Sequence, residues 1–124
     1  MAGGALKPVR WIASSREDLK SFPRHVQRSI GYALYRAQEG KKAPAAKPLK
    51  GIVKGTRVLE VIEDHQTDTY RVVYTVRFPE AVYVLHAFQK KSKKGIATPR
   101  HEIALIHRRY KAARAHHEKW RKGR

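Results

Sequence analysis

The sequence predicts an α+β fold, in which a small antiparallel sheet packs against an N-terminal helical hairpin and a C-terminal helix in the order β-α-α-β-β-β-α. Three patterns support this fold class. Apolar and polar residues alternate over 69–78, apolar residues recur at helical spacing over 26–37, and a Thr-Pro pair at 98–99 introduces a second helical pattern. With 124 residues, the chain suits one compact domain, which we expect to span 8–113 and to be followed by a basic tail at 114–124.

The first third of the chain is predicted to form a strand and two helices. Apolar β-formers at 9–12 follow a proline and indicate a short strand. Two serines at 14–15 are each followed three residues later by an acidic residue, which is the capping-box spacing at the start of a helix. A second helix is expected to begin at Pro23 and to end at Gly40. The Ala-, Pro- and Lys-rich segment 41–50 is predicted to be an extended loop.

Three strands are expected in the middle of the chain, at 57–63, 69–78 and 81–88. Turn-forming residues separate the first two, and only Pro79-Glu80 separates the last two. Sequential strands joined so closely are expected to pair antiparallel.

The central strand is predicted to have two different faces, because side chains alternate along a strand. We expect the face with Tyr70, Val72 and Tyr74 to pack against helices. The opposite face is expected to be an exposed concave surface that carries cations, with Arg71, Val73, Thr75 and Arg77 on it.

The last helix is expected to begin at the Thr-Pro pair. Thr98 is predicted to be its N-cap, Pro99 its first residue, and Glu102 an acid in its first turn. Apolar residues then follow at spacings of three, four and three, at Ile103, Ile106, Tyr110 and Ala113.

Composition points to a polyanionic partner. The chain has 28 Lys and Arg against 10 Asp and Glu, a formal net charge of +18, which favours nucleic acid, an anionic membrane surface or an acidic protein. Because cysteine is absent, disulfides and thiolate metal sites are excluded, and a reducing cytoplasm is the expected setting. No Walker loop, GxGxxG, GxSxG or HExxH pattern occurs, so we predict neither a metal nor a cofactor.

The cations themselves could support metal-free cleavage of RNA, in which a 2′-hydroxyl attacks the neighbouring phosphate. Such a reaction needs groups that move protons and cations that stabilise the charged phosphate. The candidate catalytic residues are Arg71 in mid-strand, His86 on the next strand, and Lys90 and Lys91 at its end. Glu60 and Glu63 lie on a neighbouring strand. Further candidates for RNA binding are Arg57, Arg77, Lys93 and Lys94. As an exposed cation, Arg71 is expected to be replaceable by alanine with little loss of folding.

The second half of the chain resembles the phage-type HigB toxins of the RelE/ParE superfamily. The resemblance rests on TYRVVYTVR at 69–77, AVYVLHAFQKKS at 81–92 and Thr98-Pro99, with support from KPLKG at 47–51 and VLEVI at 58–62. It implies a microbial RNase fold with a curved antiparallel sheet. In this family Arg71 matches a mid-strand arginine, and Lys90 and Lys91 match a basic pair that ends the last strand.

The resemblance also implies a function and a partner. It implies a toxin that cleaves messenger RNA during translation on the ribosome, and a small helix-turn-helix antitoxin (HigA-like) that neutralises it. Two alternatives remain open from the residues alone. One is a non-catalytic basic RNA-binding module, and the other is a ParE-like inhibitor of gyrase.

Overall fold

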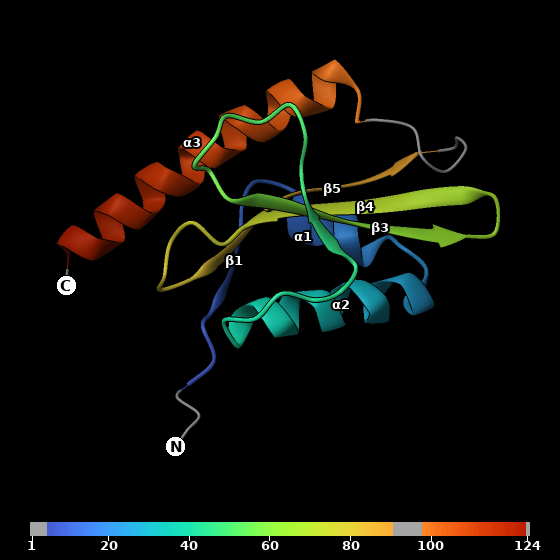
Figure 1. Cartoon of the computed structure of the whole chain (residues 1–124), viewed down its shortest axis with the longest axis horizontal. Coiled ribbons are helices and arrows are strands. Elements are labelled where there is room, and N and C mark those ends of the chain that lie inside the picture. Colours follow the sequence, from blue (N-terminus) through green and yellow to red (C-terminus); the bar gives the residue numbers. More distant parts are fainter. Residues whose placement is uncertain (1–4, 91–97, 124) are drawn as a thin grey trace.

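The computed structural model describes residues 5–90 and 98–123 of the chain. A five-stranded sheet lies between two helical layers, with α1 and α2 on one face and α3 on the other (Figure 1). This arrangement confirms the α+β class. The elements are β1 (Val9–Trp11), α1 (Ser15–Lys20), α2 (Arg24–Gln38), β2 (Ala46–Pro48), β3 (Val58–His65), β4 (Asp68–Thr75), β5 (Val82–Lys90) and α3 (Arg100–Lys122).

The strands follow the order β1-β5-β4-β3-β2 across the sheet. As predicted, β3, β4 and β5 pair antiparallel with their sequence neighbours. Two features differ from the prediction. The first strand pairs parallel with β5, and three residues of the expected loop at 41–50 form β2 on the edge beside β3. A three-residue edge strand that ends in proline has too little periodicity to be found in the sequence.

The end of the central strand also differs from the prediction, because β4 stops at Thr75. The backbone amide of Arg77 donates to the Thr75 hydroxyl over 3.1 Å, a local bond that competes with continued pairing. The connection to β5 therefore spans six residues and not two. As a consequence Phe78 does not share the face of Tyr70 and Tyr74 but belongs to the core beneath α3.

Both faces of the sheet carry an apolar core. On one face Val26, Ile30 and other residues of α2 pack against Tyr70, Val72 and Tyr74. On the other, α3 contributes Ile106, Tyr110 and Ala113 to a core with Val73, Tyr83 and Leu85. The prediction that this second face is an exposed concave surface is therefore wrong. Alternation assigns a residue to a face, but it does not tell whether a distant helix covers that face.

The third helix begins later than expected. Its N-cap position is Pro99 and no side chain caps it, so the prediction of Thr98 as the N-cap is wrong; the Thr98 hydroxyl bonds to groups of the sheet instead. The helix continues without a break through the basic segment to Lys122. Within the described part of the chain, no helix combines the length and apolar character needed to cross a membrane.

Candidate functional site

Arg71 lies in the middle of β4, on the sheet face that α3 covers. Its residue is 1% exposed, so the predicted exposed position is wrong. Its guanidinium Nη1 donates to the Thr98 hydroxyl over 2.9 Å and lies 3.6 Å from a carboxylate oxygen of Glu60 on β3. The same Thr98 hydroxyl donates to Glu60 over 3.4 Å. A buried arginine needs such partners, because an uncompensated charge is costly in the interior.

Glu60 is a carboxyl group with limited access to water, since its side chain is 14% exposed. Burial raises the pKa of Glu60 above its ordinary value, and this effect outweighs the lowering by Arg71, Thr98 and Lys47. Burial favours the neutral form of a carboxyl group. At a given pH, Glu60 is therefore protonated to a larger extent than an exposed glutamate.

His86 lies on β5 of the same sheet face, next to a second carboxylate. Its Nε2 is 2.7 Å from Glu102 at the start of α3. Its Nδ1 is 3.3 Å from a guanidinium nitrogen of Arg109, which also donates to the backbone carbonyl of Leu85 over 3.0 Å. The ring of Phe88 stacks on the imidazole with centroids 4.7 Å apart.

These contacts define the protonation of His86. A guanidinium can only donate, so Nδ1 of His86 accepts from Arg109 and Nε2 carries the proton donated to Glu102. The imidazole is then neutral. Burial lowers the pKa of His86, against the raising effect of Glu102. His86 is thus a neutral base near neutral pH, held in one tautomer by two charged neighbours.

The sheet register brings Arg71 close to two other predicted residues. Arg71 pairs with Phe88, while His86 and Lys90 stand two positions to either side on β5. Diagonal neighbours of this kind have Cβ atoms about 7–8 Å apart or less. Lys90 is partly exposed, so it forms the solvent-facing edge of the group. We call Glu60, Arg71, His86 and Glu102 the sheet cluster.

The remaining predicted residues are not part of the sheet cluster. Lys91, Lys93 and Lys94 lie outside the described residues. Arg57 precedes β3 and Arg77 follows β4, so both lie at the opposite end of these strands from Lys90. They line a separate pocket.

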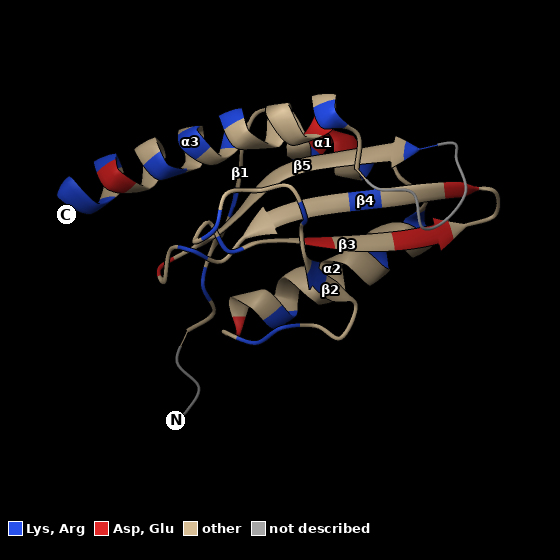
Figure 2. Ribbon diagram, turned by 45° about the horizontal axis from the view of Figure 1, so that its top comes forward, with Lys and Arg blue, Asp and Glu red and all other residues tan. Residues whose placement is uncertain are grey.

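Sequence reasoning assigned no site role to Thr98, Glu102 or Arg109, which approach the sheet from another element. Glu102 and Arg109 are seven residues apart on α3 and therefore share a helix face. That spacing is visible in the sequence, but nothing local indicates that this face meets His86. Figure 2 shows the charge distribution around the site, with Asp and Glu along β3 and Lys and Arg along α3.

The sheet cluster has the groups needed for proton transfer at a charged centre. Glu60 on β3 and His86 on β5 flank Val73 of β4 in one row of the register. Two interstrand spacings separate them, about 9–10 Å between backbones, and Arg71 comes from the strand between. Burial pushes both titratable groups towards their neutral forms. Among residues 5–90 and 98–123, no group of three or more His, Asp or Glu could hold a metal ion.

Comparison with known proteins identifies a family and a related solved structure. Residues 17–111 match the family model described as phage derived protein Gp49-like (DUF891). No curated protein matches the chain. A crystal structure of the toxin–antitoxin complex RelBE2 from Mycobacterium tuberculosis is similar at 16% identity and a TM-score of 0.46, over 71% of this chain and 95% of that chain. The family match agrees with the phage-type resemblance of the sequence.

Proposed function

The chain belongs to the phage-derived Gp49-like family, and from this premise we propose that it is the toxin of a type II toxin–antitoxin system. Its activity is metal-independent cleavage of messenger RNA, carried out on the ribosome. The formal charge of +18 supports binding to a polyanion of this kind. The observation that carries the proposal is that Glu60, Arg71 and His86 meet on one sheet face, with Arg71 on the strand between those of Glu60 and His86.

In the proposed reaction, Arg109 first releases its hydrogen bond to Nδ1 of His86. The ribose 2′-hydroxyl then attacks the adjacent phosphorus and gives its proton to that nitrogen. The phosphorus–oxygen bond to the 5′-oxygen breaks, and this oxygen takes a proton from the protonated form of Glu60. The products are a 2′,3′-cyclic phosphate and a free 5′-hydroxyl. Arg71 stabilises the negative charge on the phosphate, and Glu102 stabilises the imidazolium that forms.

Access to the sheet cluster requires a local change. Because Arg71 is 1% exposed, a phosphate can reach its guanidinium only if the Thr98 hydroxyl gives up its hydrogen bond. A phosphate oxygen would then take the place of that hydroxyl as the acceptor, by a charge-assisted bond that is shorter and stronger. Thr98 lies two residues before the start of α3, so displacing it need not disturb the helix core at Ile106 and Tyr110.

The partner in this proposal is a small helix-turn-helix antitoxin. It is suggested by the resemblance to phage-type HigB, and by the excess of positive charge, which an acidic protein surface would complement. The non-catalytic RNA-binding module is favoured by one specific observation, the burial and ion pairing of Arg71 with Glu60. A cleavage experiment separates the two.

The decisive experiment has two parts. The first maps new messenger RNA 5′ ends after expression of the protein is induced. The second measures cleavage of messenger RNA by the purified protein, with and without ribosomes, and in excess chelator. We expect new ends that depend on ribosomes and persist in chelator. His86→Asn should lower the cleavage rate about 10²- to 10⁴-fold, the usual contribution of a proton-transfer group. His25→Ala is the matched control, because His25 is exposed on α2. Cleavage by His86→Asn at the rate of the unaltered protein would refute the proposed site.

A further inference from the structure

A second charged feature lies outside the sheet cluster, on the α2 side of the sheet. It is a pocket of about 570 Å³, within the range of about 300–1,000 Å³ that is usual for ligand pockets. Its apolar lining comes from Ala37, Pro48, Val58, Leu59, Val76 and Pro79. Its charged lining consists of Lys7, Lys41, Lys42, Arg57 and Arg77. No acidic residue is among the described residues that line it, so none of these five charges is neutralised within the pocket. We call it the basic pocket.

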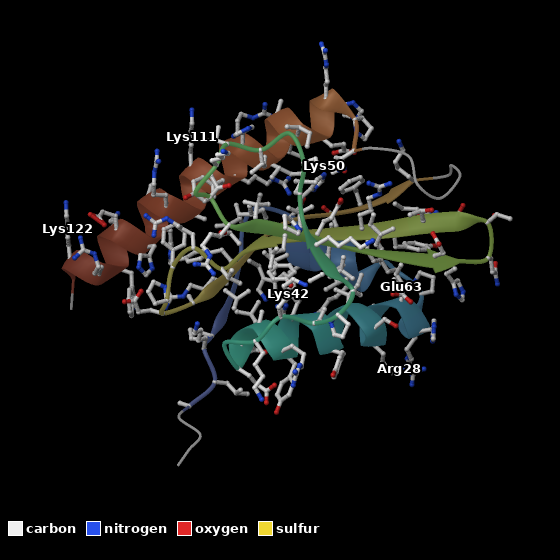
Figure 3. All side chains as sticks on the ribbon, in the orientation of Figure 1. Arg28, Lys42, Lys50, Glu63, Lys111 and Lys122 are labelled. Carbon is white, nitrogen blue, oxygen red and sulfur yellow. The ribbon has the colours of Figure 1, made fainter. Side chains whose placement is uncertain are left out.

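The end of α2 directs two of these lysines to the pocket. Gly40 adopts φ +80°, a left-handed conformation that glycine reaches without strain. The amides of Gly40 and Lys41 then bond back to the carbonyls of Ala37 and Arg36, each over 2.9 Å. This is the pattern of a Schellman termination, and the chain beyond it places Lys41 and Lys42 in the pocket lining. Lys42 is labelled in Figure 3, in the segment that follows α2.

Arg57 reaches the pocket through an unusual backbone conformation. Its φ is +50°, a region that side chains other than glycine rarely adopt. Its carbonyl accepts from the Val76 amide and the Thr75 hydroxyl, each over 3.2 Å. These bonds hold the residue in place, although asparagine or glycine would fit the conformation better. Non-glycine residues held in this region are concentrated at binding and active sites.

The lining fits one nucleotide unit of a single strand. An apolar floor can contact a base or the faces of a sugar, while cations around it bind the flanking phosphates. We propose that the basic pocket binds the phosphodiester backbone of single-stranded nucleic acid, with one nucleotide seated on the apolar floor. The inference rests on the proposed function in one respect only, which is that the natural ligand of the pocket is RNA. Leu59 and Val76 of the floor pack on the α2 side, whereas Arg71 faces α3, so the pocket is a binding site distinct from the sheet cluster.

The test is fluorescence anisotropy with a labelled 2′-O-methyl RNA 12-mer, which lacks the attacking hydroxyl. The pocket variant combines Lys41→Ala, Lys42→Ala and Arg57→Gly. Glycine is chosen at 57 because it tolerates the positive φ, so this substitution removes strain together with the charge. The matched control combines Arg16→Ala, Lys20→Ala and Arg24→Ala, three exposed cations on α1 and α2 that lower the net charge equally.

Each phosphate contact on a single strand contributes about 0.7 to the slope of log affinity against log salt. Loss of three contacts should therefore reduce the slope by about 2 in the pocket variant and leave it unchanged in the control. Equal slopes for both variants would overturn the proposal. The proposal would also be overturned if the pocket variant bound RNA as before but no longer bound polyglutamate, because the pocket would then be a site for an acidic protein.

A DNA strand of the same sequence identifies the recognised group. If the pocket variant loses affinity equally for DNA and RNA, the pocket recognises the phosphates. If it loses affinity only for RNA, the pocket also recognises the ribose. Either result supports the proposed binding site. Thermal melting of each variant shows that the protein tested is folded. Because the probe cannot be cleaved, the binding test and the cleavage test are independent. A negative binding result would not affect the cleavage result with His86→Asn, and a negative cleavage result would not affect the binding result.

Discussion

Replacement of Arg71 by alanine is the perturbation that most directly tests the buried arrangement on the α3 face. An exposed cation could be removed with little effect, as the sequence suggested. In the structure, removal leaves the carboxylate of Glu60 in a largely buried site without its main positive partner. Breaking a buried pair from one side costs about 3–5 kcal/mol. Since Glu60 is 14% exposed and keeps the hydroxyl of Thr98, we expect the lower end, about 3 kcal/mol.

That free energy converts to a large change in melting temperature. Unfolding entropy of about 2.1 cal/mol/K per residue gives roughly 260 cal/mol/K for 124 residues. Each kcal/mol then lowers Tm by about 4 °C, and the Arg71→Ala variant should melt about 12 °C below the unaltered protein near pH 8. Circular dichroism melting measures the shift. The double variant Arg71→Ala/Glu60→Gln should recover most of it, because a neutral amide costs less to bury than a carboxylate.

The pH dependence provides a further check. Burial raises the pKa of Glu60 in the folded protein, so its contribution to stability is complete below the unfolded pKa and is lost as pH rises through the folded pKa. Without Arg71, which lowers this pKa, the loss is larger and extends to higher pH. The Tm deficit should therefore be smaller near pH 5 than near pH 8. A deficit below about 4 °C at pH 8, or an equal deficit at both pH values, would refute the reasoning.

Two other predictions concern single buried groups. Burial lowers the pKa of His86, so the stabilising effect of His86 is complete above the unfolded pKa and is lost as pH falls through the folded pKa. The His86→Asn variant should therefore show a smaller decrease of Tm between pH 7 and pH 5 than the unaltered protein. Equal decreases of Tm for the two proteins would contradict this prediction. The Tyr74 hydroxyl has no hydrogen-bond partner among the described residues, and burial raises the pKa of Tyr74 to about 12. Tyr74→Phe should therefore be neutral or stabilising by up to about 1 kcal/mol in urea unfolding, whereas a clear loss of stability would show that the hydroxyl is bonded.

Local patterns in the sequence predicted most of the elements and the assignment of residues to faces. The apolar stripe over 26–37 and Gly40 located α2 and its end. The alternation over 69–75 placed Tyr70 and Tyr74 on one side of the sheet and Arg71 on the other. These properties depend on backbone geometry within a few residues, so the sequence of each segment is sufficient to predict them.

The sequence by itself determined the α+β class, the large positive charge and the side of β4 on which Arg71 lies. Only the tertiary structure decided that α3 covers that side, that Glu60 and Glu102 pair there with Arg71 and His86, and that Arg57 and Arg77 belong to a different pocket. Burial and ion pairing depend on contacts between segments far apart in the chain, such as residues 86 and 102 or 60 and 71. Such contacts form only when helices and strands dock, and no periodicity within one segment records which partner it will meet.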